Sequence, residues 1–301
     1  MNGSRERLAA IDVGSNTVLL TVAEYDPETG LVIVEEGEDQ PRLGAGLSGT
    51  GRLSEESMHR AIGTLTAMRD VCRRHSVVRL AAVATAAVRE AGNGAEFVER
   101  VRKLGLPLRI ISPETEAALS YRSAAYHFPG GERRMVTDIG GGSLELIGAA
   151  NGVVTLSRSL PLGAVRLTEL GLPLEKLREH IRRALSASMQ ASAWAGSTVI
   201  GSGGTFATLA SIVLARRGSA DGAVHGIVVQ AKELEQMLVT LAGLSTEQRR
   251  QTRGLRPERA DIIVAGLAVV AELLRIVESA EVTVSGFGLR DGLLLEMAGL
   301  E

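Results

Sequence analysis

Short apolar runs bounded by turn residues alternate along the chain with longer amphipathic segments. Residues 8–13, 17–25 and 31–37 are rich in apolar and β-branched side chains and are separated by turn signals, so we predict three strands. The stretch 54–75 instead repeats its apolar residues every three or four positions, which predicts a helix with one buried face. Its apolar positions are Met58, Ile62, Leu65, Met68 and Cys72.

Strands and helices continue to alternate after residue 75. The further predicted strands are 77–84, 106–111, 134–138, 143–149, 152–160, 198–200 and 282–284. The further predicted helices are 94–103, a helix that opens at Ser112-Pro113-Glu114, 174–193, 205–216, 231–243 and 257–278. Three strands followed by alternating helices and strands thus occur twice, in approximate form. This order predicts an internally duplicated α/β fold.

A break in this order indicates where the two copies meet. Residues 127–133 read His-Phe-Pro-Gly-Gly-Glu-Arg, a combination typical of a connecting segment. A chain of 301 residues is long enough for about two domains, each with a core of its own. We therefore predict an N-terminal domain over residues 1–128 and a C-terminal domain over residues 129–301.

Composition narrows the class of protein. The chain has 33 basic and 35 acidic residues, a net charge of −2, which argues against a nucleic-acid-binding protein. No apolar run approaches the roughly 20 residues of a membrane span, and the first residues contain no signal-peptide core, so we expect a cytoplasmic protein without membrane contact. The single cysteine, Cys72, excludes an internal disulfide, and its place on an apolar helix stripe predicts a core residue.

One short motif occurs twice, 126 residues apart. Residues 11–20 (IDVGSNTVLL) align without a gap on residues 137–146 (TDIGGGSLEL). In each copy an apolar strand ends in an aspartate, Asp12 or Asp138, and a turn of small or hydroxyl residues leads into a second apolar strand. The second copy has a further acid, Glu145, where the first has a leucine. This difference places the candidate chemistry in the second copy.

The two turns are candidate phosphate-binding sites. Glycine leaves backbone N–H groups uncovered, and uncovered N–H groups bind phosphate oxygens. For either turn by itself, the alternative is a β-hairpin whose glycines only satisfy turn geometry, but a structural turn has no reason to keep these residues in register twice. The predicted phosphate-binding residues are Asp12, Gly14, Ser15 and Asn16 in the first copy and Gly140, Gly141, Gly142 and Ser143 in the second.

A third glycine-rich turn, at residues 201–205, lies between a predicted strand and a predicted helix. Anions bind readily at a helix N-terminus, because the first N–H groups there have no partner within the helix. We therefore predict that Gly203, Gly204 and Thr205 contact phosphate. The alternative is a tight loop that needs glycine only for its backbone angles.

The acids beside the second turn suit phosphate chemistry. Hydrolysis of a phosphoanhydride requires an oriented water and a cation that neutralises charge on the transferred phosphoryl group. Asp138 and Glu145 flank the turn on adjacent predicted strands, and their oxygens suit Mg²⁺, or Mn²⁺ as a substitute. We predict that both residues are catalytic and bind the metal. The five histidines show no metal-ligand spacing.

Eight segments, in order along the chain, carry a resemblance to a known family. They are AIDVGSNTVLL (10–20), VATAAVREA (83–91), IISPETEAAL (110–119), VTDIGGGSLEL (136–146), SLPLGAVRLTE (159–169), IGSGGTFATLA (200–210), GLRPERADIIVAG (254–266) and VSGFGLRDGLL (284–294). Together they resemble the Ppx/GppA phosphatases, which are exopolyphosphatases and guanosine pentaphosphate phosphohydrolases. The resemblance implies two actin-like, ribonuclease-H-like α/β domains with the active site in the cleft between them.

The resemblance also implies roles for two further residues. The acid of the family's Glu-Ala step, matched here by Glu116, is the base that activates water, so Glu116 becomes the third catalytic residue. Without the resemblance, Glu116 would be interpreted as complementing a helix dipole, as Glu114 is. Arg89 matches a phosphate-contacting arginine of the family, although Ala86 and Ala87 replace the more polar residues often found before it.

Four charged residues in family-like motifs are left out of the predicted site. Alternating opposite charges around a helix start more often hold domains together than bind a ligand. These residues are Arg259, Asp261, Arg290 and Asp291, and no role is assigned to Arg166.

Three functional classes fit these observations unequally. The best fit is a metal-dependent phosphohydrolase that releases the terminal phosphate of inorganic polyphosphate, of guanosine pentaphosphate or of both. An actin-like phosphotransferase would need an acceptor pocket and normally a larger chain, and a non-catalytic nucleotide sensor would be expected to lack one of the three acids. A homodimer is expected from family habit. Distributive cleavage is expected because the chain ends before the extra helical portion of long family members.

Overall fold

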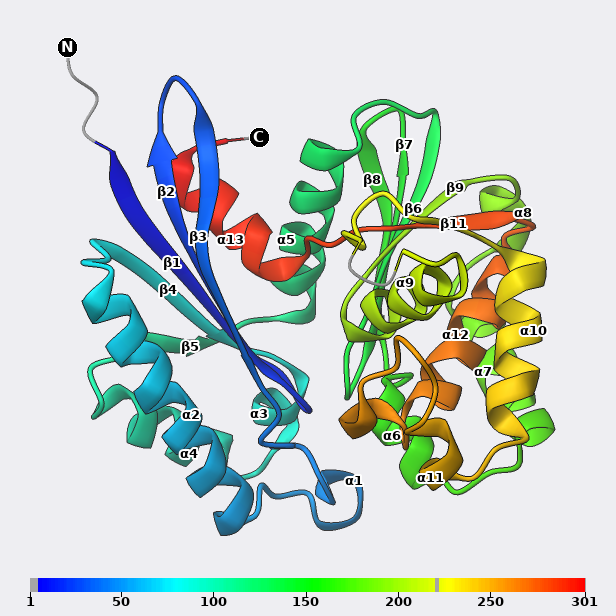
Figure 1. Cartoon of the computed structure of the whole chain (residues 1–301), viewed down its shortest axis with the longest axis horizontal. Coiled ribbons are helices and arrows are strands. Elements are labelled where there is room, and N and C mark those ends of the chain that lie inside the picture. The colour runs from blue at the N-terminus through cyan, green and yellow to red at the C-terminus, as the bar shows by residue number, and fades with distance from the viewer. Residues whose placement is uncertain (1–4, 220–221, 301) are drawn as a thin grey trace. The chain divides into compact units, whose positions relative to one another are not determined.

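The computed structural model describes residues 5–219 and 222–300, and its contacts divide the chain into two units (Figure 1). Unit 1 comprises the described residues up to Tyr126 and from Leu289 onward, and unit 2 comprises those from His127 to Gly288. Each unit has one sheet and its own set of helices.

The sheet of unit 1 has five strands. They are β1 (Glu6–Val13), β2 (Val18–Asp26), β3 (Gly30–Asp39), β4 (Arg79–Ala84) and β5 (Leu108–Ile110). Their order in the sheet is β3-β2-β1-β4-β5. The first three form an antiparallel meander, whereas β4 pairs in parallel with β1 and β5 pairs in parallel with β4. Parallel neighbours require a crossover, and the helices of unit 1 provide it.

Both faces of this sheet are buried. Ile11 and Val13 of β1 belong to one apolar cluster and Leu8 and Ala10 to another, as the two-residue period of a strand requires. The first cluster includes residues of α1 (Leu47–Thr50), α2 (Glu55–Arg74), α3 (Ala86–Glu90) and α4 (Gly94–Arg102). The second includes residues of α5 (Pro113–His127) and α13 (Leu289–Ala298).

The last helix corrects the predicted domain division, which assigned residues 129–301 to the C-terminal domain. Leu293 of α13 packs in the same apolar cluster as Leu8 of β1. A Cβ added to Gly292 would lie 2.1 Å from the carbonyl oxygen of Leu119, so α13 and α5 are in close contact. The end of the chain therefore returns to unit 1, which sequence order could not reveal.

The sheet of unit 2 repeats the arrangement. Its strands are β6 (Arg133–Ile139), β7 (Leu144–Ala150), β8 (Val153–Leu160), β9 (Thr198–Ser202), β10 (Val228–Gln230) and β11 (Glu281–Val284). The order is β10-β11-β9-β6-β7-β8. Strands β6, β7 and β8 again form an antiparallel meander, and the pairs β6–β9 and β9–β11 are parallel. The predicted duplication is therefore confirmed, and both units have the actin-like, ribonuclease-H-like α/β fold.

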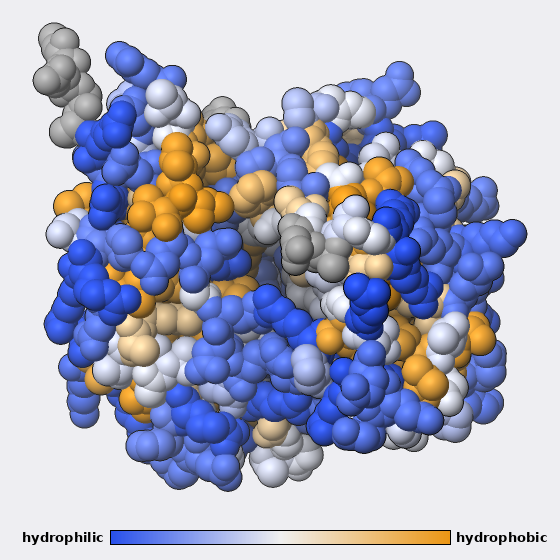
Figure 2. Space-filling model, in the orientation of Figure 1, coloured by the Kyte–Doolittle hydropathy of each residue, from blue (hydrophilic) through white to orange (hydrophobic). Residues whose placement is uncertain are grey.

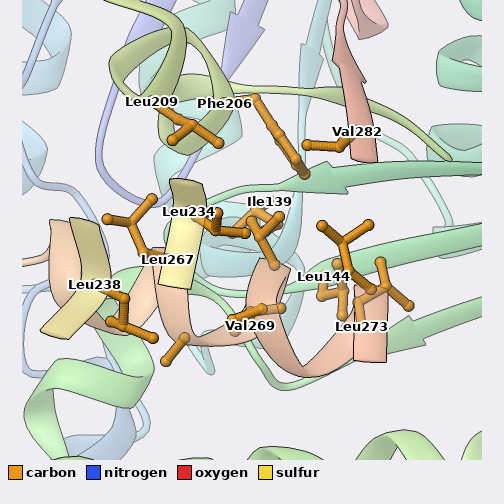
Figure 3. Close-up of a cluster of buried hydrophobic side chains, with 14 of the residues drawn as sticks. Ile139, Leu144, Phe206, Leu209, Leu234, Leu238, Leu267, Val269, Leu273 and Val282 are labelled. Carbon is orange, nitrogen blue, oxygen red and sulfur yellow. The ribbon is translucent and has the colours of Figure 1, made fainter. Parts of the chain in front are cut away.

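The helices of unit 2 enclose an apolar core. They are α6 (Ala164–Glu169), α7 (Leu174–Ser188), α8 (Ala191–Trp194), α9 (Gly204–Arg216), α10 (Ala231–Ala242), α11 (Thr246–Arg249), the 3-10 helix η1 (Pro257–Arg259) and α12 (Ile263–Ile276). Figure 3 shows Phe206 of α9, Leu234 of α10 and Val269 of α12 in one cluster with Ile139 of β6. Residues on all sides of α12 are buried, so this helix lies within the core of unit 2.

Two predicted helices of unit 2 are shorter than expected. The helix predicted over 174–193 ends at Ser188, because Met189 adopts an extended backbone, and the short helix α8 follows. The helix predicted over 257–278 is divided into η1 and α12. Apolar periodicity continues across both breaks, and it therefore could not locate them.

One carboxylate of unit 2 is fully buried. Glu272 of α12 accepts hydrogen bonds from Arg178 (2.7 Å) and Arg182 (2.9 Å) of α7 and from Arg275 (3.2 Å) of its own helix. Burial by itself would raise the pKa of the Glu272 carboxyl, but the hydrogen bonds and charges of Arg182 and Arg178 outweigh it and lower that pKa. This ion network joins α7 to α12.

Three consecutive apolar residues of β3 are exposed. Val32, Ile33 and Val34 lie on the edge strand β3 and are exposed by 56%, 42% and 39%. Figure 2 shows an apolar patch over β2 and β3. Among the described residues, no helix combines the length and apolar character needed to cross a bilayer. The predicted homodimer stays a prediction.

Candidate functional site

The two copies of the repeated motif have the same local structure. In unit 1, Asp12 at the end of β1 lies opposite Leu19 of β2, and in unit 2, Asp138 of β6 lies opposite Glu145 of β7. The turns between these strands close with the same hydrogen bond. The N–H of Gly14 donates to Thr17 O, and the N–H of Gly140 donates to Ser143 O, each at 3.0 Å. The gapless sequence alignment is therefore also the structural alignment.

A loop after β3 braces the turn of unit 1. The N–H of Arg42 donates to Asn16 O at 3.0 Å, and the N–H of Gly44 donates to Ser15 O at 2.7 Å. A Cβ on Gly44 would lie 3.0 Å from the Ser15 Cβ and 3.3 Å from the Ala87 Cβ, so glycine permits this close approach. The loop therefore holds the turn in place by donating hydrogen bonds to the carbonyl groups of the turn.

The segment after β8 braces the turn of unit 2 in the same way. The N–H of Ala164 donates to Gly140 O (2.9 Å), and those of Val165 and Arg166 donate to Gly141 O (3.0 and 3.1 Å). The Arg166 side chain also donates from Nε to Gly142 O at 2.9 Å. Before these residues, a Cβ on Gly163 would lie 2.3 Å from the carbonyl carbon of Gly142 and 2.4 Å from Ser143 N.

These bracing bonds orient the N–H groups of both turns. In a trans peptide the C=O and the N–H of the same plane point in opposite directions. The carbonyls of Gly140, Gly141 and Gly142 face the bracing segment. The N–H groups in the same peptide planes, those of Gly141, Gly142 and Ser143, are therefore directed away from it. The carbonyls of Ser15 and Asn16 impose the same orientation in unit 1. Each turn therefore presents successive N–H groups on one side, as an anion-binding turn does.

Two acids lie beside the turn of unit 2. Directly opposite residues of an antiparallel pair project to the same face of the sheet, so the side chains of Asp138 and Glu145 are neighbours. Glu145 is 1% exposed and accepts a hydrogen bond at Oε1 from Ser159 of β8 at 2.9 Å. Ser202 of β9 donates to Asp138 Oδ2 at 2.5 Å. Burial raises the pKa of Asp138 and the Ser202 bond opposes that rise.

This acid pair fits a divalent cation in part. No group of three or more His, Cys, Asp or Glu residues is arranged to hold a metal ion within the described part of the chain. Mg²⁺, however, is usually bound by one or two carboxylates and completes its six oxygen ligands with water and substrate phosphates. Asp138 and Glu145, both carboxylates on one face beside a glycine turn, meet that minimum.

The third glycine turn lies at the N-terminus of α9. Gly203 has a φ of 90°, and a Cβ there would lie 2.8 Å from Asp138 Oδ1, so the helix start is held against the Asp138 carboxylate. A Cβ on Gly204 would lie 2.0 Å from Nη1 of Arg259. The Thr205 side chain packs instead against Gly266 of α12, since a Cβ there would lie 2.5 Å from Thr205 Oγ1. The expected phosphate contacts of this turn stay a prediction.

In unit 1, the predicted base and the predicted phosphate-contacting arginine are paired with each other. Glu116 is in the first turn of α5 and is 7% exposed. Arg89 of α3 donates from Nη1 to Glu116 Oε2 and to the carbonyl oxygen of Ile111, each at 3.0 Å. The structure therefore brings these two residues together, and Arg89 orients one carboxylate oxygen of Glu116.

Two side chains at and near the first turn, those of Asn16 and Arg290, make hydrogen bonds within unit 1. The side-chain nitrogen of Asn16 donates to Thr17 Oγ1 and to Gln40 Oε1, each at 3.3 Å, so donation to phosphate would require an exchange of these bonds. Arg290 of α13 donates to Leu20 O and Thr21 Oγ1 of β2, each at 2.8 Å. Burial lowers the pKa of Arg290, while the carboxylates of Glu36 and Asp12 oppose that shift.

Sequence reasoning missed the residues that support the site. Their positions became apparent only from contacts between segments far apart in the chain. Within the family-like segment 159–169, the residues from Ser159 to Arg166 supply the support for the unit 2 turn. Arg259 was excluded, yet it touches Gly204. These segments resemble the corresponding segments of the family, but the resemblance did not indicate that their residues support the site.

Each unit thus has an α/β fold with an oriented glycine turn, and the turn of unit 2 has an acid pair beside it. The profile of the Ppx/GppA phosphatase family matches residues 21–301. The chain therefore belongs to the Ppx/GppA phosphatase family.

Relatives and solved structures agree with this assignment. Exopolyphosphatase 2 of Mycobacterium tuberculosis is 30% identical, with 97% of this chain and 99% of that protein aligned. Exopolyphosphatase 1 of Mycobacterium leprae is 29% identical, with 96% and 88% aligned. The crystal structure of the Ppx/GppA family member of Aquifex aeolicus is 32% identical, with a TM-score of 0.82 over 98% of both chains. An exopolyphosphatase from Cytophaga hutchinsonii, 24% identical over 98% of this chain and 99% of its own, shares the fold with a TM-score of 0.90.

Proposed function

We propose that this protein is an exopolyphosphatase, a hydrolase that releases the terminal phosphate of inorganic polyphosphate. The names of the relatives that match nearly the whole chain support this substrate. The observation that carries the proposal is the bracing of the two turns. In each turn, hydrogen bonds to the carbonyl groups direct the N–H groups to one side of that turn.

In the hydrolytic step, Glu116 acts as the base. The oxygen of a water molecule attacks the terminal phosphorus, and the bond from that phosphorus to the bridging oxygen breaks. The shortened chain leaves with the bridging oxygen, and the Glu116 carboxylate accepts the proton of the water. The hydrogen bond from Arg89 to Oε2 orients this carboxylate.

Asp138 and Glu145 would hold Mg²⁺, with Mn²⁺ as a substitute. When bound, the cation neutralises charge on the phosphoryl oxygens. Ser202 and Ser159 fix the two carboxylates by hydrogen bonds at 2.5 and 2.9 Å. A carboxylate held by a second residue loses less conformational freedom when it binds a metal.

One assay separates this function from the alternatives. Phosphate release is measured with Mg²⁺ and without an added acceptor, on tripolyphosphate, long-chain polyphosphate, guanosine pentaphosphate and nucleoside triphosphates. Release from the polyphosphates supports an exopolyphosphatase, and release from guanosine pentaphosphate as well adds the second family activity. Absence of release from every substrate, together with phosphoryl transfer in a second assay that contains an added acceptor, would replace the hydrolase by a phosphotransferase. Binding without any turnover would indicate a sensor.

A further inference from the structure

Arg290 of α13 holds a buried positive charge against the sheet of unit 1. From Nη1 it donates to Leu20 O and to Thr21 Oγ1 of β2, each at 2.8 Å, and the same nitrogen lies 3.6 Å from Glu36 Oε1 of β3. The Arg290 side chain is only 19% exposed, and burial lowers the pKa of its guanidinium because it disfavours the charged form. The protein therefore keeps a cation at a place where burial disfavours one.

The strand register places this guanidinium on the face of the sheet that carries Asp12. Directly opposite residues of an antiparallel pair project to the same face, and so do residues two apart in one strand. Asp12 is opposite Leu19, and Thr21 is two residues beyond Leu19. Asp12 and Thr21 are therefore on one face, and Arg290 reaches Thr21 from α13, which packs on that face.

Acidic side chains of β3 share this face. Glu36 is opposite Thr21 and Glu38 is opposite Leu19, so both glutamates project to the face of Asp12. The charges of the three carboxylates act against the fall in the pKa of Arg290, as negative charges close to a guanidinium do. Arg290 therefore offsets acidic charge on the face that carries Asp12.

A phosphate bound by the turn of unit 1 requires such an offset. The braced carbonyls of this turn direct the N–H groups of Asn16 and Thr17 to one side, and the turn begins directly after the strand that ends with Asp12 and Val13. A phosphate held by these N–H groups brings negative charge to the neighbourhood of the Asp12 carboxylate. Like charges repel strongly where a protein excludes water, so a positive charge on the same face favours phosphate binding.

The two halves of the duplication differ in the group that accompanies the aspartate. In unit 2, Asp138 has a second carboxylate opposite it, that of Glu145, and the pair suits a divalent cation. In unit 1, Leu19 takes the place of the second carboxylate, and the guanidinium of Arg290 is on the same face. Unit 1 therefore carries its positive charge as a fixed side chain.

We propose that Arg290 is a positioning residue for polyphosphate hydrolysis, whose buried charge balances the Asp12 carboxylate and so allows the Gly14–Thr17 turn to hold a phosphate group. This inference rests on the proposed polyphosphatase function. Arg290 acts through Asp12 and does not itself bind the phosphate. Its hydrogen bonds to Leu20 O and Thr21 Oγ1 keep the guanidinium on the face of the aspartate.

The first test is Arg290→Gln, which keeps a hydrogen-bond donor but removes the charge. We expect the KM for tripolyphosphate to rise about tenfold to a hundredfold, with a smaller change in kcat, because phosphate binding loses its charge balance. Arg290→Lys restores the charge and should give a KM closer to that of the wild type. Arg79→Gln is the matched control and should leave KM unchanged. Arg79 also donates to α13, at Met297 O, but it is at the opposite end of β4 from the residue that pairs with Asp12.

A second substitution separates charge from packing. Glu36 is paired with Arg290 and its side chain is 57% exposed, so Glu36→Gln removes an acid with little effect on the fold. A role through charge predicts that Glu36→Gln lowers KM about twofold to fivefold in the wild-type protein and recovers part of the lost affinity in the Arg290→Gln protein. A role in packing predicts no recovery. Glu36→Gln in the wild-type protein decides the question where Arg290→Gln does not fold.

Three outcomes overturn the proposal. They are a folded Arg290→Gln protein with a KM within about twofold of wild type, an equal rise of KM in Arg79→Gln, and a KM that Glu36→Gln leaves unchanged or raises. Failure of the proposed function is distinguished by calorimetric titration with tripolyphosphate, which needs no turnover. If the wild-type protein binds tripolyphosphate but does not hydrolyse it, weaker binding by Arg290→Gln still supports the role of Arg290 in holding phosphate. Equal binding, or no binding by wild type, overturns it.

Discussion

Asp138 lies directly opposite Glu145 across the β6–β7 ladder, with Ser202 bonded to the first carboxylate and Ser159 to the second. In unit 1 the same two positions are Asp12 and Leu19. The two turns are therefore alike in backbone and different in chemistry, because only one of them has two acids on a single face of its sheet.

The acid pair predicts how metal binding changes on mutation. Asp138→Asn and Glu145→Gln each replace a charged oxygen ligand by a neutral amide, so we expect Mn²⁺ or Mg²⁺ to bind at least tenfold more weakly. Calorimetric titration of Mg²⁺ and the paramagnetic signal of bound Mn²⁺ measure this without turnover. Glu132→Gln, at an exposed carboxylate before β6, is the control and should bind the metal as wild type does. Equal metal affinity in all variants would refute the site.

The proposed base predicts a large loss of turnover. Glu116→Gln keeps the size of the side chain but cannot accept the proton of water, so kcat should fall by about two to four orders of magnitude. The control is Glu114→Gln, two residues earlier in the same helical turn and exposed, which should keep kcat near the wild-type value. Steady-state phosphate release measures both. Similar kcat values for the two variants would show that Glu116 is a helix-start residue only.

The bracing of the unit 2 turn predicts the effect of one added methyl group. Gly163→Ala would place a Cβ 2.3–2.4 Å from backbone atoms of Gly142, Gly141 and Ser143, so the turn must move. We expect a loss of about 1–3 kcal/mol in unfolding free energy and a KM for substrate raised about tenfold or more. Gly63→Ala, on α2 with nothing within 4 Å of the new Cβ, should instead stabilise the protein by about 0.5–1 kcal/mol. Urea unfolding and KM are measured for both, and a neutral Gly163→Ala would contradict the contact.

The buried ion network predicts a pH-dependent stability difference. Glu272→Gln removes the buried carboxylate that Arg178 and Arg182 of α7 share, although Arg178 keeps its pairing with Glu235, and should cost about 1.5–3 kcal/mol at pH 7. The pKa of Glu272 is lowered from 4.5 in the folded protein, so its contribution is present above pH 4.5 and is lost as the pH falls through the folded pKa. Urea unfolding at pH 7 and below pH 4.5 should therefore show a gap between wild type and variant that narrows with acid. Glu278→Gln, an exposed site, should show no gap, and a pH-independent gap for Glu272→Gln would point to lost packing instead.

The single cysteine predicts slow labelling. Cys72 is 5% exposed, and burial raises the pKa of its thiol from 9.0 to about 11. At pH 8 a thiol-specific reagent should react slowly with the native protein and at once with the protein in urea. Because the thiol ionises at lower pH in the unfolded chain, its contribution to the stability of the folded protein is fully present below pH 9. That contribution is lost as the pH rises through the folded pKa of about 11. Rapid native labelling at pH 8 would show that α2 opens locally.

The sequence determined the features that depend on short stretches of chain. The Asp-Gly turns were recognisable because the residues that form them are adjacent, and the register that sets Asp138 opposite Glu145 follows from the length of the turn between them. The α2 stripe that ends in Cys72 was predicted for the same reason, since helix period is a local property. The family followed from ordered local motifs.

Tertiary structure alone decided which distant segments meet. Arg290 reaches Leu20 from 270 residues away, and this contact places the last helix in unit 1, contrary to the domain division predicted from sequence order. The pairing of Arg89 with Glu116, and the bracing of both turns by the loops after β3 and β8, likewise join residues that no local pattern relates. Hydrophobic period and turn chemistry specify elements, but the hydrogen bonds that orient a site form only after those elements have packed.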